Sequence, residues 1–142
     1  LAPAELIAAV CTVKQFLTFA VNGVFQRAVA FALRQELDWV EGLRSRLELR
    51  RDELAAGLRD AGFLVHPGQS TYFLQADVRP LGQADARDFG FRLIEDAGVV
   101  GIPSQVFYDA KAAGSPYLRF AFCKREEVIA DVVRRLRDYA AR

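Results

Sequence analysis

Hydrophobic residues in the first 35 positions recur three or four places apart, which is the spacing of one face of an α-helix. The first stripe of this kind consists of Leu6, Val10, Val13 and Leu17. Pro3 suits the start of that helix, because its missing N–H would have no partner there. Asn22-Gly23 is a turn signal, and a second short helix is predicted from about residue 26 to residue 34. These two helices have little of their own to pack on, so we expect them to belong to a larger body.

The next segment predicts one long helix, because a single apolar stripe with helical spacing runs along it. The stripe consists of Leu37, Val40, Leu43, Leu47, Leu54 and Leu58. Gly62 follows as the expected stop. The stretch LRSRLELRRDEL, residues 43–54, carries charges of both signs on the other face. It predicts a solvated helix surface with many ion pairs.

Beyond Gly62 the hydrophobic period shortens towards two, which is typical of β-strands. In chain order the pattern predicts strands at 63–65 and 70–77 around a turn at His66-Pro67-Gly68, a helix at 85–97, a strand at 99–102, an irregular loop at 103–116, a strand at 117–122 and a helix from about 126 to 139. Phe89, Leu93 and Ile94 are expected to face inward. The order predicts a compact α+β domain from about residue 36 onward.

Composition narrows the possible partners. The 142 residues suit one domain, and 19 basic against 18 acidic residues leave a net charge of +1. That balance gives no argument for nucleic acid or for an anionic membrane, and we expect neither as a partner.

Cys11 and Cys123 lie in apolar contexts, so we expect buried reduced thiols, and no metal-binding spacing is present. We recognise no signal peptide and expect a cytoplasmic protein. The chain contains no Met, even at position 1, so we expect that it does not begin at a natural translation start.

The strand YLRFAF, residues 117–122, has a permanent cation at its centre. Alternation puts two sets of side chains on opposite faces: Tyr117, Arg119 and Ala121 on one, and Leu118, Phe120 and Phe122 on the core face. Two explanations of Arg119 stay open. It serves structure, on the wet face of an edge strand or in an ion pair with a carboxylate such as Asp77. Alternatively, it is reserved for the carboxylate or phosphate of a ligand.

Other residues offer weaker chemistry. His66, the only histidine, is expected to be solvated in its turn, and no nucleophilic triad can be built around it. None of the three lysines, Lys14, Lys111 and Lys124, is a convincing Schiff-base nucleophile.

Two aromatic stretches complete the set of candidates. In TYF, Tyr72 and Phe73 are expected on opposite faces, one of them in the core and the other free to line a pocket. In FLTF, Phe16 and Phe19 are either packing residues or part of an interface.

Several stretches, read in order, resemble one protein family. They are PAELIAAVCTVKQFLTF, FQRAVAFAL, RRDELAAGLRDAGFLV, STYFLQADV, GVVGIPSQVFY and YLRFAFCKREE. Together they resemble the C-terminal part of the pyridoxal-phosphate aminotransferases of fold type I. The groups most similar to this chain are the kynurenine, methionine and N-succinyldiaminopimelate aminotransferases. The resemblance covers essentially the whole chain.

The resemblance implies an aspartate-aminotransferase-like architecture. Residues 1–35 would be the tail of the large cofactor-binding domain, with a loop that faces the partner of a homodimer. Residues 36–142 would be the small C-terminal α+β domain, including a linking helix at 36–61. The family usually has Gly where this chain has Ser70, and related chains often have Pro where it has Val24.

The resemblance also implies roles for single residues. Arg119 would bind the α-carboxylate of the substrate, Tyr72 would lie near the substrate, and Phe19 would reach the active site of the partner subunit. The implied reaction transfers an amino group between an amino acid and a 2-oxo acid, with pyridoxal 5′-phosphate as the cofactor. The family's cofactor lysine is expected upstream of Leu1, so the 142 residues alone are expected to be inactive.

Two other functions stay open beside amino transfer. A cysteine-conjugate β-lyase that depends on pyridoxal phosphate would share the carboxylate-binding arginine. A non-catalytic binding or dimerisation module derived from the same family would need no cofactor.

Overall fold

The computed structural model describes residues 2–66 and 68–142, and it divides the chain into two compact units. The first unit ends at Gly42 and the second begins at Leu43. The domain boundary expected at residues 35 and 36 concerns the division of the whole protein and stays a prediction. Of the predicted turn at residues 66–68, position 67 lies outside the described residues.

The first unit is helical. It contains α1 (Ala4–Leu17), α2 (Gly23–Gln35) and the beginning of α3 (Leu37–Asp60). Helix α2 begins three residues earlier than predicted, because the side chain of Asn22 accepts a hydrogen bond from the N–H of Val24 and so caps the helix. Neither α1 nor α2 has a buried residue. Their apolar faces therefore have no cover within the described unit.

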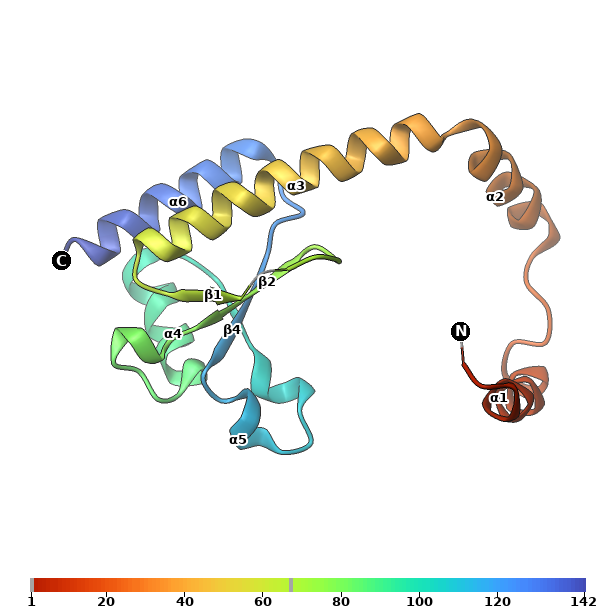
Figure 1. Ribbon diagram of the computed structural model, residues 1–142, viewed down its shortest axis with the longest axis horizontal. Helices are drawn as coiled ribbons and strands as arrows, with labels where there is room; N and C mark the ends of the chain where they lie inside the picture. Colours follow the sequence, from red (N-terminus) through yellow and green to blue (C-terminus); the bar gives the residue numbers. More distant parts are fainter. Residues whose placement is uncertain (1, 67) are drawn as a thin grey trace. The chain divides into compact units, whose positions relative to one another are not determined.

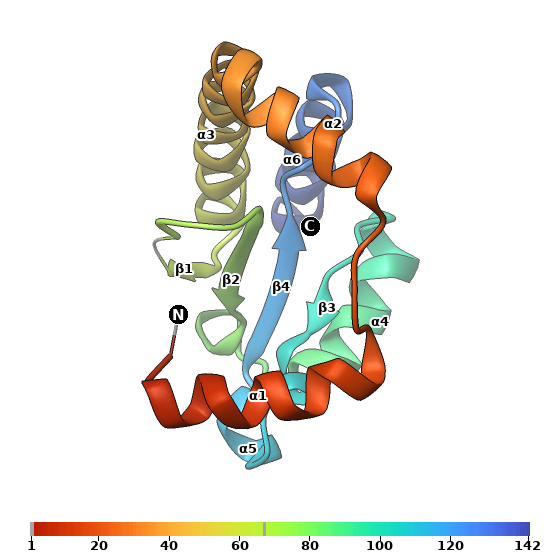
Figure 2. The ribbon, with the colours of Figure 1, turned by 90° about the vertical axis from the view of Figure 1, so that its right-hand side faces the viewer.

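The second unit is built on an antiparallel sheet of four strands in its described part. They are β1 (Leu64–His66), β2 (Phe73–Asp77), β3 (Ile102–Pro103) and β4 (Tyr117–Ala121). Figure 2 shows them side by side in the order β1-β2-β4-β3. Strand β3 begins later than the predicted strand at 99–102 and is shorter.

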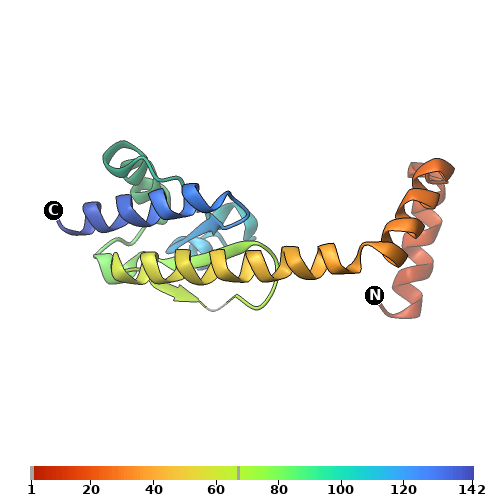
Figure 3. The same cartoon turned by 90° about the horizontal axis from the view of Figure 1, so that it is seen from above.

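Three helical segments of this unit supply one side of the core. They are α4 (Ala86–Ala97), α6 (Glu126–Ala140) and the part of α3 from Leu43 onward. Figures 1 and 3 show α3 and α6 side by side. The loop predicted at 103–116 is more regular than expected, because it contains two short helices. These are η2 (Ser104–Phe107) and α5 (Lys111–Gly114), and a further short helix, η1 (Arg79–Leu81), follows β2.

Alternating burial in the strands confirms the predicted core face. Leu118 and Phe120 on β4 are buried, and their neighbours on either side are only partly so. Helix α4 differs from its prediction at one position, since Phe89 and Leu93 are buried but Ile94 is 40% exposed. Arg119 lies on the opposite face of the sheet, which carries none of these buried side chains at its centre. We call it the open face.

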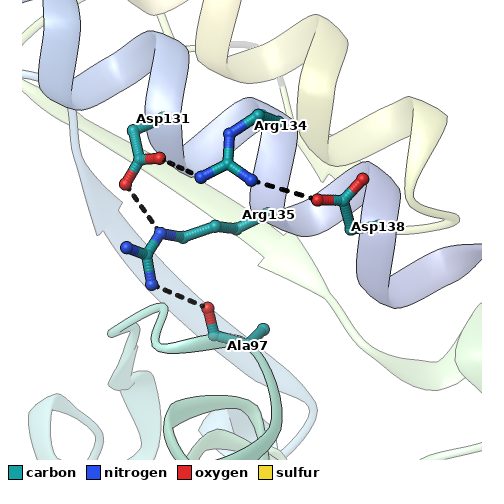
Figure 4. Close-up of polar contacts among 5 residues, drawn as sticks. All are labelled: Ala97, Asp131, Arg134, Arg135 and Asp138. Atoms are coloured by element: carbon teal, nitrogen blue, oxygen red, sulfur yellow. Dashed lines mark hydrogen bonds and ion pairs between the residues drawn. The ribbon is translucent and has the colours of Figure 1, made fainter.

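Ion pairs run along α6, and one of their arginines contacts the end of α4 (Figure 4). Asp131 accepts hydrogen bonds from Arg134 and from Arg135, and Arg134 also donates to Asp138. Arg135 Nη1 lies 3.5 Å from the carbonyl oxygen of Ala97, the last residue of α4. The two arginines lower the pKa of Asp131 below its ordinary value, chiefly through the hydrogen bond from Arg134.

None of the helices in the described part of the chain combines the length and the apolar character that a membrane span requires.

Candidate functional site

Arg119 lies on an internal strand of the sheet. Strand β4 pairs with β2 on one side and with β3 on the other, so the edge-strand explanation of Arg119 is wrong. The register places His66, Gln75, Arg119 and Ile102 in one row across the open face. The four strands thus bring together residues from four separate parts of the chain.

The alternative ion pair with Asp77 is also absent. Asp77 is 1% exposed, and its carboxylate accepts hydrogen bonds from Nε and Nη2 of Arg79 at 2.9 and 2.5 Å. The hydrogen bond from Arg79 lowers the pKa of Asp77 below its ordinary value, against the opposing effect of burial. Arg79 therefore neutralises the nearby carboxylate, and Arg119 does not.

Two aromatic rings enclose the guanidinium of Arg119. Its Cζ lies 4.0 Å from the centre of the Phe73 ring and 4.1 Å from the centre of the Phe107 ring. Its Nε is buried and has no hydrogen-bond partner. Among the residues that the structure describes, no carboxylate forms an ion pair with Arg119. A partly buried cation without a counter-ion is unfavourable, so this geometry favours an anionic ligand.

The shape of the guanidinium narrows the chemistry of such a ligand. Its N–H groups form a planar fork, which can donate two parallel hydrogen bonds to one carboxylate. Because both rings lie close to Cζ, we infer that a ligand would approach the edge of the fork. The arrangement can therefore hold and orient a carboxylate.

Tyr72 lies next to this arrangement. Its ring centre is 4.5 Å from that of Phe73, which in turn contacts Arg119. Tyr72 is 47% exposed and Phe73 is half-buried on the open face, so the expectation that one of the pair lies in the core is wrong. The neighbouring Thr71 has a positive φ of 64°, one residue after the Ser70 that replaces the family's usual Gly.

Phe19 belongs to the other unit, just after α1. It is 84% exposed and has a positive φ of 49°, which is uncommon for an aromatic residue. Its N–H donates to the carbonyl oxygen of Lys14 and so closes the end of the helix. The side chain is left without cover within its own unit.

The structure corrects two further expectations. Cys11 and Cys123 are both exposed, because α1 has no cover in its unit and Cys123 follows the end of β4. His66 ends strand β1 instead of lying in a turn. It remains exposed as expected, and its ring centre is 5.5 Å from that of Tyr117.

The lysines of the chain are in exposed positions. All three, Lys14, Lys111 and Lys124, are exposed, and Lys14 Nζ donates to the hydroxyl of Thr18. A Schiff-base lysine needs a desolvated pocket to lower its pKa. The described residues also contain no group of three side chains that could hold a metal ion.

The helix surface formed by LRSRLELRRDEL is ion-paired, as predicted. Arg51 pairs with Glu48 and Asp52, and Arg44 pairs with Glu48. The hydrogen bond from Arg51 to Asp52 raises the pKa of Arg51 above its ordinary value. A hollow lies between this surface and Ser70, but its charges are already paired.

Sequence reasoning missed Phe107 as a neighbour of Arg119. The residue lies in a segment predicted to be an irregular loop, twelve positions before Arg119 in the chain. Gln75 and Tyr108, which are hydrogen-bonded beside it at 3.4 Å, were missed as well. The only signal for them in the sequence is the aromatic pair Phe107-Tyr108, shortly before the strand that contains Arg119.

Comparison with known proteins identifies the family. The model of the family described as aminotransferase class I and II matches residues 1–136. A probable N-succinyldiaminopimelate aminotransferase of Mycobacterium tuberculosis, DapC, is 45% identical over 148 residues, which cover 99% of this chain and 37% of that protein. A methionine aminotransferase of Escherichia coli is 33% identical over 137 residues, which cover 96% of this chain and 35% of that protein.

Solved structures agree with the sequence matches. The structure of N-succinyldiaminopimelate aminotransferase from Mycobacterium tuberculosis aligns with a TM-score of 0.81 and 46% sequence identity. The alignment covers 97% of this chain and 36% of that chain, so this chain spans a little more than a third of the relative's length. The α+β fold is therefore that of the C-terminal domain of aspartate-aminotransferase-like enzymes. The chain belongs to the family of class I and II aminotransferases.

Proposed function

We propose that the protein carrying this chain is an aminotransferase that moves an amino group between an amino acid and a 2-oxo acid. The chain is its C-terminal part, and Arg119 binds the α-carboxylate that both substrates share. The family and the names of the relatives support amino transfer. Residues 1–35 are the tail of the large domain, and residues 36–142 are the small domain.

One observation carries the role of Arg119. It is a half-buried cation on the open face of the sheet, with a buried Nε that has no partner. The potential counter-ion on the neighbouring strand, Asp77, is already paired with Arg79. A bound carboxylate would supply the missing charge and the missing hydrogen-bond acceptors.

Two further residues complete the proposed site. Tyr72 lies near the substrate, as its contact with Phe73 supports. Phe19 reaches the active site of the partner in a homodimer, which would cover its exposed ring. The cytoplasm is the compartment that we propose.

Pyridoxal 5′-phosphate is the cofactor that we infer for the whole protein, since the family uses it. When bound, this cofactor accepts the electron pair released at the substrate's α-carbon. The exposed lysines of this chain do not suit its attachment, so we assign none of these residues to the cofactor. The 142 residues alone are accordingly proposed to be inactive.

Product analysis separates the alternatives. A β-lyase would release ammonia and pyruvate from a cysteine conjugate, whereas an aminotransferase converts a 2-oxo acid into an amino acid. A non-catalytic module would do neither. The relatives that we compared are named as aminotransferases, which favours amino transfer.

Replacing Arg119 by Ala in the full-length protein tests the proposal. We expect KM for the amino donor to rise about 100-fold, equivalent to about 3 kcal/mol of lost carboxylate binding. Arg46→Ala is the matched control, because Arg46 is an exposed arginine on α3 and its removal changes the net charge equally. An unchanged KM in Arg119→Ala, or an equal change in both variants, would reject the role.

A further inference from the structure

Phe107 is the residue to which the structure gives a position but the family resemblance gave no role. It is 57% exposed, yet its ring centre lies 4.1 Å from Cζ of Arg119. Phe73 approaches the same carbon from β2, where it pairs with Ala121 and is thus the diagonal neighbour of Arg119. No contact joins the two rings in the described part of the chain, so they lie on different sides of the guanidinium.

The segment around Phe107 is firmly supported. Gly114 packs so closely against η2 that a Cβ there would lie 2.6 Å from Cα of Gln105 and 2.6 Å from Cδ2 of Tyr108. Tyr108 Oη also accepts a hydrogen bond from Nε2 of Gln75, the residue paired with Arg119 across the sheet. The contacts with Gly114 and Gln75 therefore fix the segment that places Phe107 next to Arg119.

A long arginine side chain loses much rotational freedom when it binds a ligand. Contacts that restrict the side chain before binding reduce this cost. Cations over aromatic faces also gain electrostatic energy from the ring. Rings on both sides of the fork would hold its plane and leave its edge to a ligand.

We propose that Phe107, together with Phe73, is a positioning residue that holds the guanidinium of Arg119 ready for a planar carboxylate. This inference rests on the proposed function, in which Arg119 binds the substrate carboxylate. Phe107 itself touches no reacting atom. It acts through Arg119, so its effect should appear in ligand binding and should vanish when Arg119 is absent.

The test measures binding of 2-oxoglutarate, used as a carboxylate probe, to the full-length holoenzyme by calorimetry. We expect Phe107→Leu, which keeps apolar volume but removes the ring, to raise the dissociation constant about fivefold. Phe107→Tyr keeps the ring and should stay within about twofold of the parent protein. Phe91→Leu is the matched control, because Phe91 is 59% exposed on α4 and contacts no cation among the residues that the structure describes. In steady-state kinetics, Phe107→Leu should raise KM and leave kcat little changed.

A double-mutant cycle separates the two proposals. If Arg119→Ala leaves the dissociation constant unchanged, the proposed function fails and the positioning role fails with it. If Arg119→Ala weakens binding and Phe107→Leu has no effect in the parent protein, the positioning role alone is overturned. The same conclusion holds if Phe107→Leu weakens binding equally with and without Arg119. Phe73→Leu provides a second, independent variant, with the same weakening expected, should Phe107→Leu fail to fold.

Discussion

Asp77 and Arg79 form an ion pair only two residues apart, in which the buried carboxylate of Asp77 also accepts a hydrogen bond from the N–H of Arg79 at 2.9 Å. The pair closes the turn after β2 and neutralises the carboxylate. The arginine that neutralises Asp77 is thus Arg79, in η1, and not Arg119, on β4.

We expect Asp77→Asn to lower the free energy of unfolding by about 1–2 kcal/mol at pH 7, because it removes the charged acceptor from a buried position. The folded protein lowers the pKa of Asp77, so this stabilisation is present above the unfolded value near 4 and is lost as the pH falls through the folded value. Unfolding measured at pH 7 and at pH 3 should show the two proteins converging in acid. Binding of a carboxylate by Arg119 should not change. A constant difference across this pH range would contradict the assignment.

Gly57 marks the closest approach of α3 to α6. A Cβ at this position would lie 2.6 Å from Cγ2 of Val133, which is 6% exposed and rotates little because it is β-branched. We expect Gly57→Ala to lower the free energy of unfolding by about 1–3 kcal/mol, measured by urea unfolding. In a Val133→Ala background the same change should cost less, since the contacted atoms are gone. Additive effects of the two changes would show that the helices do not meet there.

Arg135 joins α6 to the end of α4 through the carbonyl oxygen of Ala97 (Figure 4). Cations near the C-terminal carbonyls of a helix stabilise it. We expect Arg135→Met to accelerate hydrogen exchange at the amides of Gly98 and Val99, which donate to carbonyls in the last turn of α4. Arg134→Met is the control, because the ion pairs of Arg134 stay within α6. Equal acceleration in both variants would argue against the link between the helices.

The local pattern predicted much of the secondary structure and one face of the sheet. Alternation placed Leu118 and Phe120 in the core, and the helical stripe placed Leu54 and Leu58 there, as observed. Such predictions succeed because the period of a helix or a strand depends on neighbouring residues only. Ile94 shows the limit of the method, because the width of a buried stripe depends on what packs against it.

The environment of Arg119 could not be predicted from its own strand. The alternation showed that it shares a face with Tyr117, but two structural explanations and a functional one stayed open. The strand order β1-β2-β4-β3 makes β4 internal and removes the first structural explanation. Asp77 pairs with Arg79 across a short loop, and this removes the second structural explanation, an ion pair between Asp77 and Arg119.

By itself, the sequence determined the helices and strands, the α+β class and the resemblance to aminotransferases, because these depend on local period and on the order of short motifs. The tertiary structure decided which residues meet. Phe73 and Phe107, 34 positions apart, both contact Arg119 because β2 pairs with β4 and η2 lies beside that pair. Contacts of this kind depend on strand order and on the packing of distant segments, and no local hydrophobic pattern encodes either.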